Sequence, residues 1–158
     1  MYDPATDALT FRLGGTVYLA FATSGGYTYT SDGAAWTDDT QDTKYLAFWD
    51  DRLWGIDSTG QLWFSLAIGV ETNDAQLQLP NGYVTDLLVG RDGNGDEILY
   101  AASKVGLFAH DIGNQRFVQT GLMLPRNDDA GVGCVNWRDA IYFPAGESIY
   151  KYQAGGGG

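Results

Sequence analysis

The residues with the clearest chemical potential lie in one acidic, glycine-rich segment, Arg91-Asp92-Gly93-Asn94-Gly95-Asp96-Glu97. Asp92, Asn94 and Asp96 alternate, so their side-chain oxygens could converge on one hard cation, and Ca²⁺ prefers oxygen ligands of this kind. The last ligand position of an EF-hand would fall on Ser103, which excludes an EF-hand. The segment therefore predicts either a weak Ca²⁺ site or a hairpin whose acidic residues are solvated.

Trp49 and Trp137 form a second set of candidate binding residues, because they lie outside the aromatic residues that recur in phase along the chain. An exposed indole ring can stack on the C–H face of a sugar while neighbouring polar side chains bind its hydroxyl groups. The alternative is packing inside the core, where an aromatic ring buries on the order of 150–250 Å². The sequence therefore leaves two alternatives for Trp49 and Trp137, a platform for a glycan or a place in the packed core.

Residues for catalysis are poorly grouped. The arginines are scattered along the chain, whereas a sialidase needs three of them around the substrate carboxylate. The glutamates, Glu71, Glu97 and Glu147, all fall in predicted turns, and His110 has no neighbouring residues typical of a catalytic triad. No nucleophile elbow, P-loop or dinucleotide-binding fingerprint is present. We expect no enzymatic activity and assign no catalytic residue.

The charge balance and the cysteine count exclude several classes of function. Nine basic against 20 acidic side chains give the 158-residue chain a net charge of −11, which argues against binding to nucleic acid or to anionic lipid. The single Cys134 excludes an intramolecular disulfide and a Cys-based zinc site. The chain has no apolar run of about 18 residues, so the sequence predicts no membrane insertion. Met1-Tyr2-Asp3-Pro4 does not begin a signal peptide. Apart from Ca²⁺, we expect no cofactor.

The elements that position these residues are short strands. The chain has 22 Gly and 22 aromatic residues (5 Trp, 10 Tyr and 7 Phe), a composition typical of β-proteins with many tight turns. Apolar and polar residues alternate in segments such as 16–21, 61–65 and 149–152, and Gly, Asn and Asp separate these segments. This pattern predicts an all-β fold built from hairpins.

The strands recur with a period near 40 residues. An aliphatic residue followed by Tyr or Trp begins a strand at four places: Val17-Tyr18, Leu53-Trp54, Leu99-Tyr100 and Ile141-Tyr142. A second aromatic residue follows each pair after a turn of small residues: Tyr27, Trp63, Phe108 and Tyr150. The pattern W-x-D-x-(L/I)-(W/Y) also occurs twice, at 49–54 and at 137–142. About four short strands per period indicate the blades of a β-propeller.

We therefore predict a β-propeller segment over residues 1–153, with blades at about 8–43, 44–81, 82–127 and 128–153, and a Gly-rich exit linker at 154–158. The fourth strands of the first three blades are expected near 35–37, 75–79 and 116–120. The fourth blade has no residues left for such a strand. The chain is then expected to be a segment of a larger propeller, and the alternative is a closed four-blade ring.

One blade carries a resemblance to a known group of proteins. The segment from Tyr45 to Asp57, followed by Gln61-Leu62-Trp63-Phe64-Ser65, resembles blades of tail-associated virion proteins of tailed bacteriophages. The likeness covers one blade well and the other three loosely. It implies a structural protein of a phage or prophage, concerned with the tail or with adhesion, and it transfers no catalytic residue.

The segment Thr30-Ser31-Asp32-Gly33-Ala34-Ala35-Trp36 resembles a shortened Asp-box, a turn found in sialidases and in many secreted propellers. The resemblance implies a structural role, in which Asp32 accepts backbone hydrogen bonds, Gly33 takes a positive φ and Trp36 packs on the sheet. Ser31 completes this motif. His110–Phe117 is a degenerate version in the third blade.

We thus expect a structural or interaction module of a phage-like virion, made in the host cytoplasm, that displays loops on rigid blades. Its expected partners are other virion subunits, further copies of itself, or a cell-surface glycan. The alternatives are a glycan-binding, lectin-type propeller and a fragment of a sialidase-like glycoside hydrolase.

Overall fold

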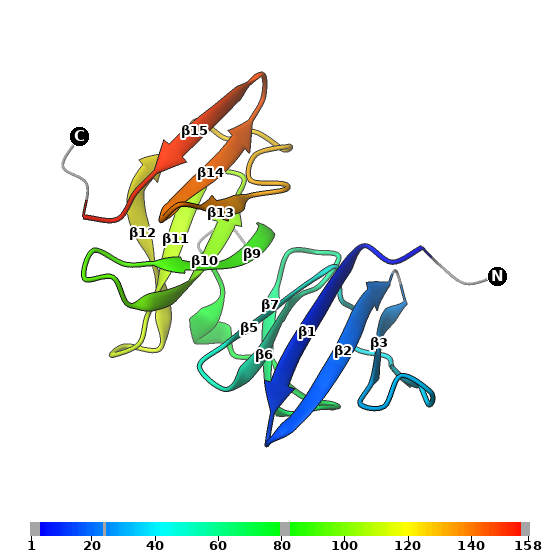
Figure 1. The fold of residues 1–158 in the computed structure, drawn as a ribbon. Helices are drawn as coiled ribbons and strands as arrows, with labels where there is room; N and C mark the ends of the chain where they lie inside the picture. The colour runs from blue at the N-terminus through cyan, green and yellow to red at the C-terminus, as the bar shows by residue number, and fades with distance from the viewer. Residues whose placement is uncertain (1–3, 24, 80–82, 156–158) are drawn as a thin grey trace. The chain divides into compact units, whose positions relative to one another are not determined.

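Four antiparallel β-sheets follow one another along the chain (Figure 1). The computed structural model describes residues 4–23, 25–79 and 83–155. The chain divides into two compact units, Met1–Ala75 and Gln76–Gly158, and each unit contains two of the sheets. We call the sheets blades 1 to 4 in chain order. The predicted all-β class and the four propeller-type blades are confirmed.

The first unit contains blades 1 and 2. Blade 1 consists of β1 (Asp7–Leu13), β2 (Thr16–Thr23), β3 (Gly26–Thr30) and β4 (Thr37–Asp39), and blade 2 of β5 (Tyr45–Trp49), β6 (Arg52–Ile56), β7 (Leu62–Ala67) and β8 (Val70–Thr72). Strands that are consecutive in the chain are neighbours in each sheet. A short 3₁₀ helix, η1 (Ala75–Leu77), follows blade 2.

The second unit contains blades 3 and 4. Blade 3 consists of β9 (Val84–Arg91), β10 (Glu97–Ser103), β11 (Gly106–Asp111) and β12 (Arg116–Met123), and blade 4 of β13 (Val135–Trp137), β14 (Ala140–Ala145) and β15 (Ser148–Tyr152). Blade 4 has three strands within the described residues, as the sequence predicts. Of the predicted exit linker, residues 156–158 lie outside the part of the chain that the structure describes.

The fourth strand of blade 2 is the main error in the predicted elements. It was expected at 75–79, but the strand is β8 at Val70–Thr72, and Ala75–Leu77 forms η1 instead. The reason is a tight turn: Ala67 pairs with Val70, and Gly69 between them has a φ of 77°. Glycine takes this conformation at little cost, so the chain reverses earlier than the average period suggests.

Each unit has an apolar core between its two blades. In the first unit the core includes Phe11, Ala20 and Tyr27 of blade 1 and Leu53 and Trp63 of blade 2. In the second unit it includes Tyr100, Ala102 and Leu107 of blade 3 and Ile141 and Phe143 of blade 4. The two faces of a strand alternate, so each of these blades presents one face to its neighbour and the opposite face elsewhere.

Two-residue turns join the first two strands of blades 1, 2 and 4. The turn residues, Gly14-Gly15, Asp50-Asp51 and Arg138-Asp139, all have positive φ, between 50° and 86°. Positive φ at both central residues is the geometry of a type I′ turn, whose twist matches that of the flanking strands. The repeated W-x-D-x-(L/I)-(W/Y) pattern thus encodes a hairpin, although its turn residues are not glycine.

Replacing Asp51 by Gly in the β5–β6 turn is expected to raise the free energy of unfolding by about 0.5–1 kcal/mol. The left-handed conformation costs an ordinary residue about 1–2 kcal/mol, and part of this gain is offset by the larger backbone entropy of glycine in the unfolded chain. Urea unfolding monitored by tryptophan fluorescence measures the change. Asp51→Ala is the control and is expected not to stabilise; equal stabilisation by both variants would contradict the turn geometry.

Candidate functional site

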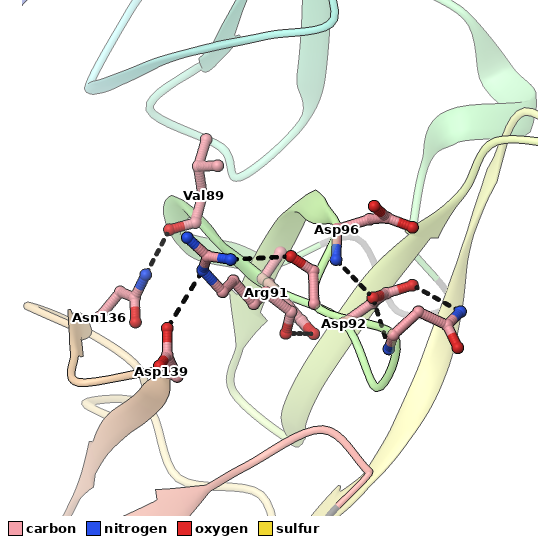
Figure 2. Close-up of polar contacts among 9 residues, drawn as sticks. Val89, Arg91, Asp92, Asp96, Asn136 and Asp139 are labelled. Atoms are coloured by element: carbon pink, nitrogen blue, oxygen red, sulfur yellow. Dashed lines mark hydrogen bonds and ion pairs between the residues drawn. The ribbon is translucent and has the colours of Figure 1, made fainter.

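The predicted Ca²⁺ residues form a compact loop between β9 and β10, shown in Figure 2. The Oδ1 atom of Asp92 accepts backbone N–H bonds from Asn94 at 2.8 Å and from Asp96 at 2.9 Å. The side-chain amide of Asn94 donates to Oδ2 of Asp92 at 3.4 Å. The backbone N–H groups of Asp96 and Asn94, in that order, lower the pKa of Asp92. The carboxylate of Asp92 therefore organises the loop.

A second loop of the chain, with no alternating acids, has the same hydrogen bonds. Between β6 and β7, Oδ1 of Asp57 accepts from the backbone of Thr59 at 2.8 Å and of Gln61 at 2.9 Å. The backbone N–H of Asp57 donates to the carbonyl of Gln61 at 2.9 Å, as Asp92 donates to Asp96 at 2.8 Å. The shared geometry needs only an Asp at the start of the loop and a Gly at the fourth position. A structural role thus accounts for Asp92, whereas Asn94 and Asp96 occupy positions that Thr59 and Gln61 fill equally well.

We expect added CaCl₂ to leave the thermal midpoint of unfolding unchanged relative to EGTA. Across the described residues, no group of three or more His, Cys, Asp or Glu side chains is arranged to hold a metal ion. A ligand that binds only the folded state would raise the midpoint, by an amount that increases with the logarithm of its concentration above its dissociation constant. A midpoint that rises with Ca²⁺, and that no longer rises in Asp96→Asn, would instead establish the predicted site.

Side chains beside this loop form polar contacts between blade 3 and blade 4 (Figure 2). Nη1 of Arg91 donates to the carbonyl of Gly95 at 3.0 Å, and its Nε lies 3.1 Å from Oδ1 of Asp139. The side-chain amide of Asn136 donates to the carbonyl of Val89 at 3.1 Å. The Arg91 and Asp139 side chains are more than half exposed, so their ion pair contributes little to stability. These contacts fix the orientation of the β13–β14 turn.

The turn at Asp32 has the hydrogen bonds expected of a structural turn. Its Oδ1 accepts from the backbone of Ala34 at 2.8 Å and of Ala35 at 2.9 Å, and the latter bond is the largest cause of the lowered pKa of Asp32. Gly33 has a φ of 74°, and the ring of Trp36 lies 5.5 Å from that of Phe21. Trp36 remains 45% exposed. The degenerate motif is similar, because Asp111 accepts the backbone N–H of Asn114 at 3.2 Å.

The structure separates the two candidate glycan residues. Trp49 is only 7% exposed, so neither face of its ring is open to a sugar, whereas Trp137 is 55% exposed. Both end the first strand of their blade, and both contact the aromatic residue five positions later. The ring centroids of Trp49 and Trp54 lie 6.4 Å apart, and those of Trp137 and Tyr142 lie 6.0 Å apart. The same local structure is therefore buried in blade 2 and exposed in blade 4, and Trp49 does not fit a glycan platform.

Trp137 belongs to an apolar surface that we call the open face of blade 4, formed by Val135, Trp137, Tyr142 and Ile149. Strand register places Val135 opposite Tyr142, and Pro144 opposite Ile149, on the face away from the core residues Ile141 and Phe143. Val135 is 54% exposed and Ile149 is 71% exposed. The guanidinium of Arg138 lies 4.4 Å from the centroid of the Trp137 ring. Large apolar residues grouped in this way mark a contact surface.

A similar surface lies on blade 1, and we call it the open face of blade 1: Val17, Leu19, Phe21 and Trp36. Val17, Leu19 and Phe21 of β2 alternate with Tyr18, Ala20 and Ala22, which pack in the core toward blade 2, and Trp36, which precedes β4, packs on Phe21. Val17 is 47% exposed, and Leu19 and Phe21 are half-buried. The sequence repeat places all these residues in strands, but it does not reveal that the second face stays exposed.

A Thr-Asp pair, which the sequence analysis missed, connects the blades within each unit. The Oδ2 atom of Asp7 accepts the backbone N–H of Leu46 at 2.8 Å, and that of Asp86 accepts the N–H of Cys134 at 2.9 Å. The preceding residue also bonds across, because Thr6 donates to the carbonyl of Lys44 and Thr85 to that of Ala130, both at 2.8 Å. The recurrence of Thr-Asp-x-Leu at 6–9 and 85–88 is the sequence signal that could have revealed this connection.

Asp86→Ala is expected to lower the free energy of unfolding by about 1–3 kcal/mol, because it leaves the buried N–H of Cys134 without its acceptor. Asp86 is 9% exposed, whereas Asp7 is half-buried. Water can replace the lost acceptor more easily at Asp7, so Asp7→Ala is expected to cost about 1 kcal/mol or less. Urea unfolding of the two variants measures both values. A larger loss in Asp7→Ala than in Asp86→Ala would contradict the role of burial.

The other candidate chemical groups are part of the core. His110 is 2% exposed, and its ring packs edge-to-face on Phe117 at 5.2 Å. Burial, with a contribution from the Asp86 carboxylate, raises the pKa of the Cys134 thiol to about 12, so the thiol stays protonated at neutral pH. No helix in the described residues has the length and apolar composition needed to cross a bilayer.

Comparison with known proteins agrees with this architecture. No family model and no curated protein matches the chain. Among solved structures, the extracellular domain of the one-component system BT4673 of B. thetaiotaomicron is similar over 94% of this chain, with a TM-score of 0.68 and 19% identity. The corresponding domain described as a hybrid two-component system gives a TM-score of 0.62 and 18% identity. This chain spans only 21% of either domain.

A designed protein, Ika4, is similar over 98% of this chain and 94% of its own length, with a TM-score of 0.61 and 12% identity. At these identities the likeness concerns the fold alone. The matched natural structures are extracellular domains of a bacterial regulatory system, so these neighbours do not include the phage tail proteins that the sequence resemblance suggested. What the comparisons support is the fold, a β-propeller-type arrangement of blades.

Proposed function

We propose that this chain is a non-catalytic protein-interaction module whose contact surface is the open face of blade 4. The observation that carries this proposal is the contrast between two copies of one motif. In blade 2 the pair Trp49 and Trp54 is buried, at 7% and 0% exposure, whereas Trp137 in blade 4 is 55% exposed. The residues of this surface are buried in the equivalent blade but exposed to solvent here. An exposed apolar surface of this kind is suited to bind another apolar surface.

The neighbours of Trp137 favour a protein over a sugar as the ligand. A sugar site combines a ring platform with polar groups that bind hydroxyls, but Val135, which lies on the same face of β13 as Trp137, offers only aliphatic surface. The guanidinium of Arg138 already lies over the Trp137 ring, and the neighbouring Asn136 and Asp139 are engaged by the carbonyl of Val89 and by Arg91. Aliphatic and aromatic groups around an exposed Trp are typical of protein contact surfaces.

The blade 2 segment from Tyr45 to Ser65 supports placing the module in a phage-like virion, by its resemblance to tail-protein blades. The net charge of −11 is compatible with this, since a repelling surface keeps the subunits of a large assembly soluble. Tail, portal or capsid genes beside the parent gene would support this placement, and regulatory genes would instead favour a sensor like the matched Bacteroides domains.

Site-specific photo-crosslinking tests the interaction surface. We place p-benzoyl-phenylalanine at Ile149, which is 71% exposed, and as a control at Leu66 of blade 2, which is 64% exposed. In the cells that make the parent protein, the proposal predicts a discrete protein adduct at position 149 and none at position 66. No adduct at 149, or equal adducts at both positions, would contradict it.

A lectin is the second candidate function, and the exposed ring of Trp137 is the observation that favours it. A glycan array separates the two functions. Reproducible binding of one sugar class that Trp137→Ala abolishes would establish the lectin, whereas the protein-interaction proposal predicts an array without specific binding.

A further inference from the structure

We propose that the open face of blade 4 binds the open face of blade 1 in a second copy of this chain, head to tail. This inference rests on the proposed function and specifies its partner. It is carried by the internal repeat, which shows within each unit what kind of surface each blade face packs against.

In the second strand of each blade, an aliphatic residue precedes the recurring aromatic residue. Leu53 in blade 2 and Ile141 in blade 4 occupy this aliphatic position, and both face the preceding blade of their unit in its core, at 0% and 3% exposure. Val17 occupies the same position in blade 1, where it is 47% exposed. The open face of blade 1 is therefore the face that packs against a preceding blade.

The recurring aromatic residue faces the opposite way. Tyr18 of blade 1 and Tyr100 of blade 3 pack in the cores of their units, toward the following blade. Tyr142 occupies the same position in blade 4, on the open face beside Trp137. The open face of blade 4 is therefore the face that packs against a following blade.

The two open faces are thus of complementary kinds, like the two faces that meet in the core of each unit. Opposite charges lie on the last strands of the two faces, and strand register also places Arg12 on the first strand of the open face of blade 1, opposite Val17. Strand register places Asp38 of β4 on the open face of blade 1, in line with Phe21 and Thr28, and Lys151 of β15 on the open face of blade 4, opposite Tyr142. Both residues lie on the last strand of their blade, so stacked blades bring opposite charges to the same edge.

When two copies meet in this way, blade 4 of one copy takes the place of a preceding blade for blade 1 of the other copy. Blade 1 of that second copy takes the place of a following blade for blade 4 of the first. Because the two faces differ, the contact is heterologous. Each such contact covers Val17 and Trp36 of one copy and Trp137 and Ile149 of the other.

Sedimentation velocity of the full chain over a wide concentration range tests this pairing. We expect the average mass of the wild-type chain to rise above the monomer value of 17.1 kDa as the concentration increases. Trp137→Asp on blade 4 and Val17→Asp on blade 1 are each expected to weaken association at least tenfold. Ile112→Asp and Leu66→Asp change exposed apolar residues outside both faces, at 56% and 64% exposure, and are expected to leave association unchanged. Thermal unfolding verifies that each variant is folded, and Ile149→Asp replaces any blade 4 variant that is not.

The decisive step is to mix the two monomeric variants. Trp137→Asp retains an intact blade 1 face, and Val17→Asp retains an intact blade 4 face, so the mixture is expected to form a heterodimer through one interface. A wild-type chain that stays monomeric at all concentrations, a dimer that Val17→Asp leaves intact, or a mixture that stays monomeric would each overturn the pairing. A monomeric chain that still crosslinks to a different protein through position 149 would overturn the pairing and leave the proposed function standing, whereas the absence of any adduct at 149 would overturn that function as well.

Discussion

Gly106→Ala is expected to lower the free energy of unfolding by about 3–5 kcal/mol, one of the largest effects of a single added methyl group in this chain. Gly106 begins β11 with a φ of 138°, a conformation that disfavours a side chain. A Cβ atom there would lie 2.2 Å from the backbone carbonyl oxygen of Leu122 on the neighbouring strand β12. Because this obstacle is backbone, the sheet itself must deform. Chemical denaturation monitored by far-UV circular dichroism measures the loss.

Gly95→Ala is the matched control, because it has a φ of 91° but nothing within 4 Å of the added Cβ. It is expected to cost only the backbone strain, about 1–2 kcal/mol. Gly26→Ala repeats the experiment in the first unit, since Gly26 has a φ of 142° and its Cβ would lie 2.0 Å from the carbonyl oxygen of Asp39. Similar losses in Gly106→Ala and Gly95→Ala would show that β12 does not approach Gly106 as closely as described.

Gly55→Ala is expected to lower the free energy of unfolding by about 2–4 kcal/mol, by a different mechanism. Gly55 of β6 pairs with Trp63 of β7, and an added Cβ would lie 2.1 Å from the Trp63 ring. Trp63 is 0% exposed and stacks on Tyr27 at 5.6 Å, so the ring has little room to move. Thermal and urea unfolding, with the near-UV signal of the tryptophans, measure the effect.

The control for Gly55→Ala is Gly121→Ala in β12, where nothing lies within 4 Å of the added Cβ and φ is not positive. That substitution is expected to change stability by less than about 0.5 kcal/mol. In a Trp63→Leu background the clash disappears, so the further cost of Gly55→Ala is expected to fall below about 1 kcal/mol. Additive losses in the double variant would show that the Trp63 ring is not what Gly55 accommodates.

The blade pattern could be predicted from the sequence because it is local and repeated. The second-strand pairs such as Val17-Tyr18 and Ile141-Tyr142 mark equivalent positions of each blade, and their neighbours alternate with the period of a strand. The fourth strand of blade 2 was predicted at 75–79, too late in the chain, because a tight turn at Gly69 reverses the chain early. A period averaged over four blades cannot detect one early reversal.

The candidate surfaces could be predicted only in part. The sequence identified Trp49 and Trp137 together, since the two motifs are alike, but their exposures differ because burial depends on tertiary packing that a local motif does not encode. The Thr-Asp pairs bond to residues about 40 positions away, beyond the reach of hairpin patterns. The roles of Asp92 and Asp57 became clear only from the shared loop geometry, because five-residue turns with different sequences can have the same hydrogen bonds.

Hydroxyl-radical footprinting of the tryptophans is the most direct test of the central claim, that the open face of blade 4 is an accessible contact surface. In the dilute, isolated chain we predict that Trp137, at 55% exposure, is oxidised about as fast as Trp36, at 45%, and that Trp49, Trp54 and Trp63 react slowly. In the assembled state, whether self-associated or bound to another protein, Trp137 is predicted to become protected while Trp49 stays slow. Slow oxidation of Trp137 in the dilute chain, or unchanged oxidation on assembly, would contradict the claim.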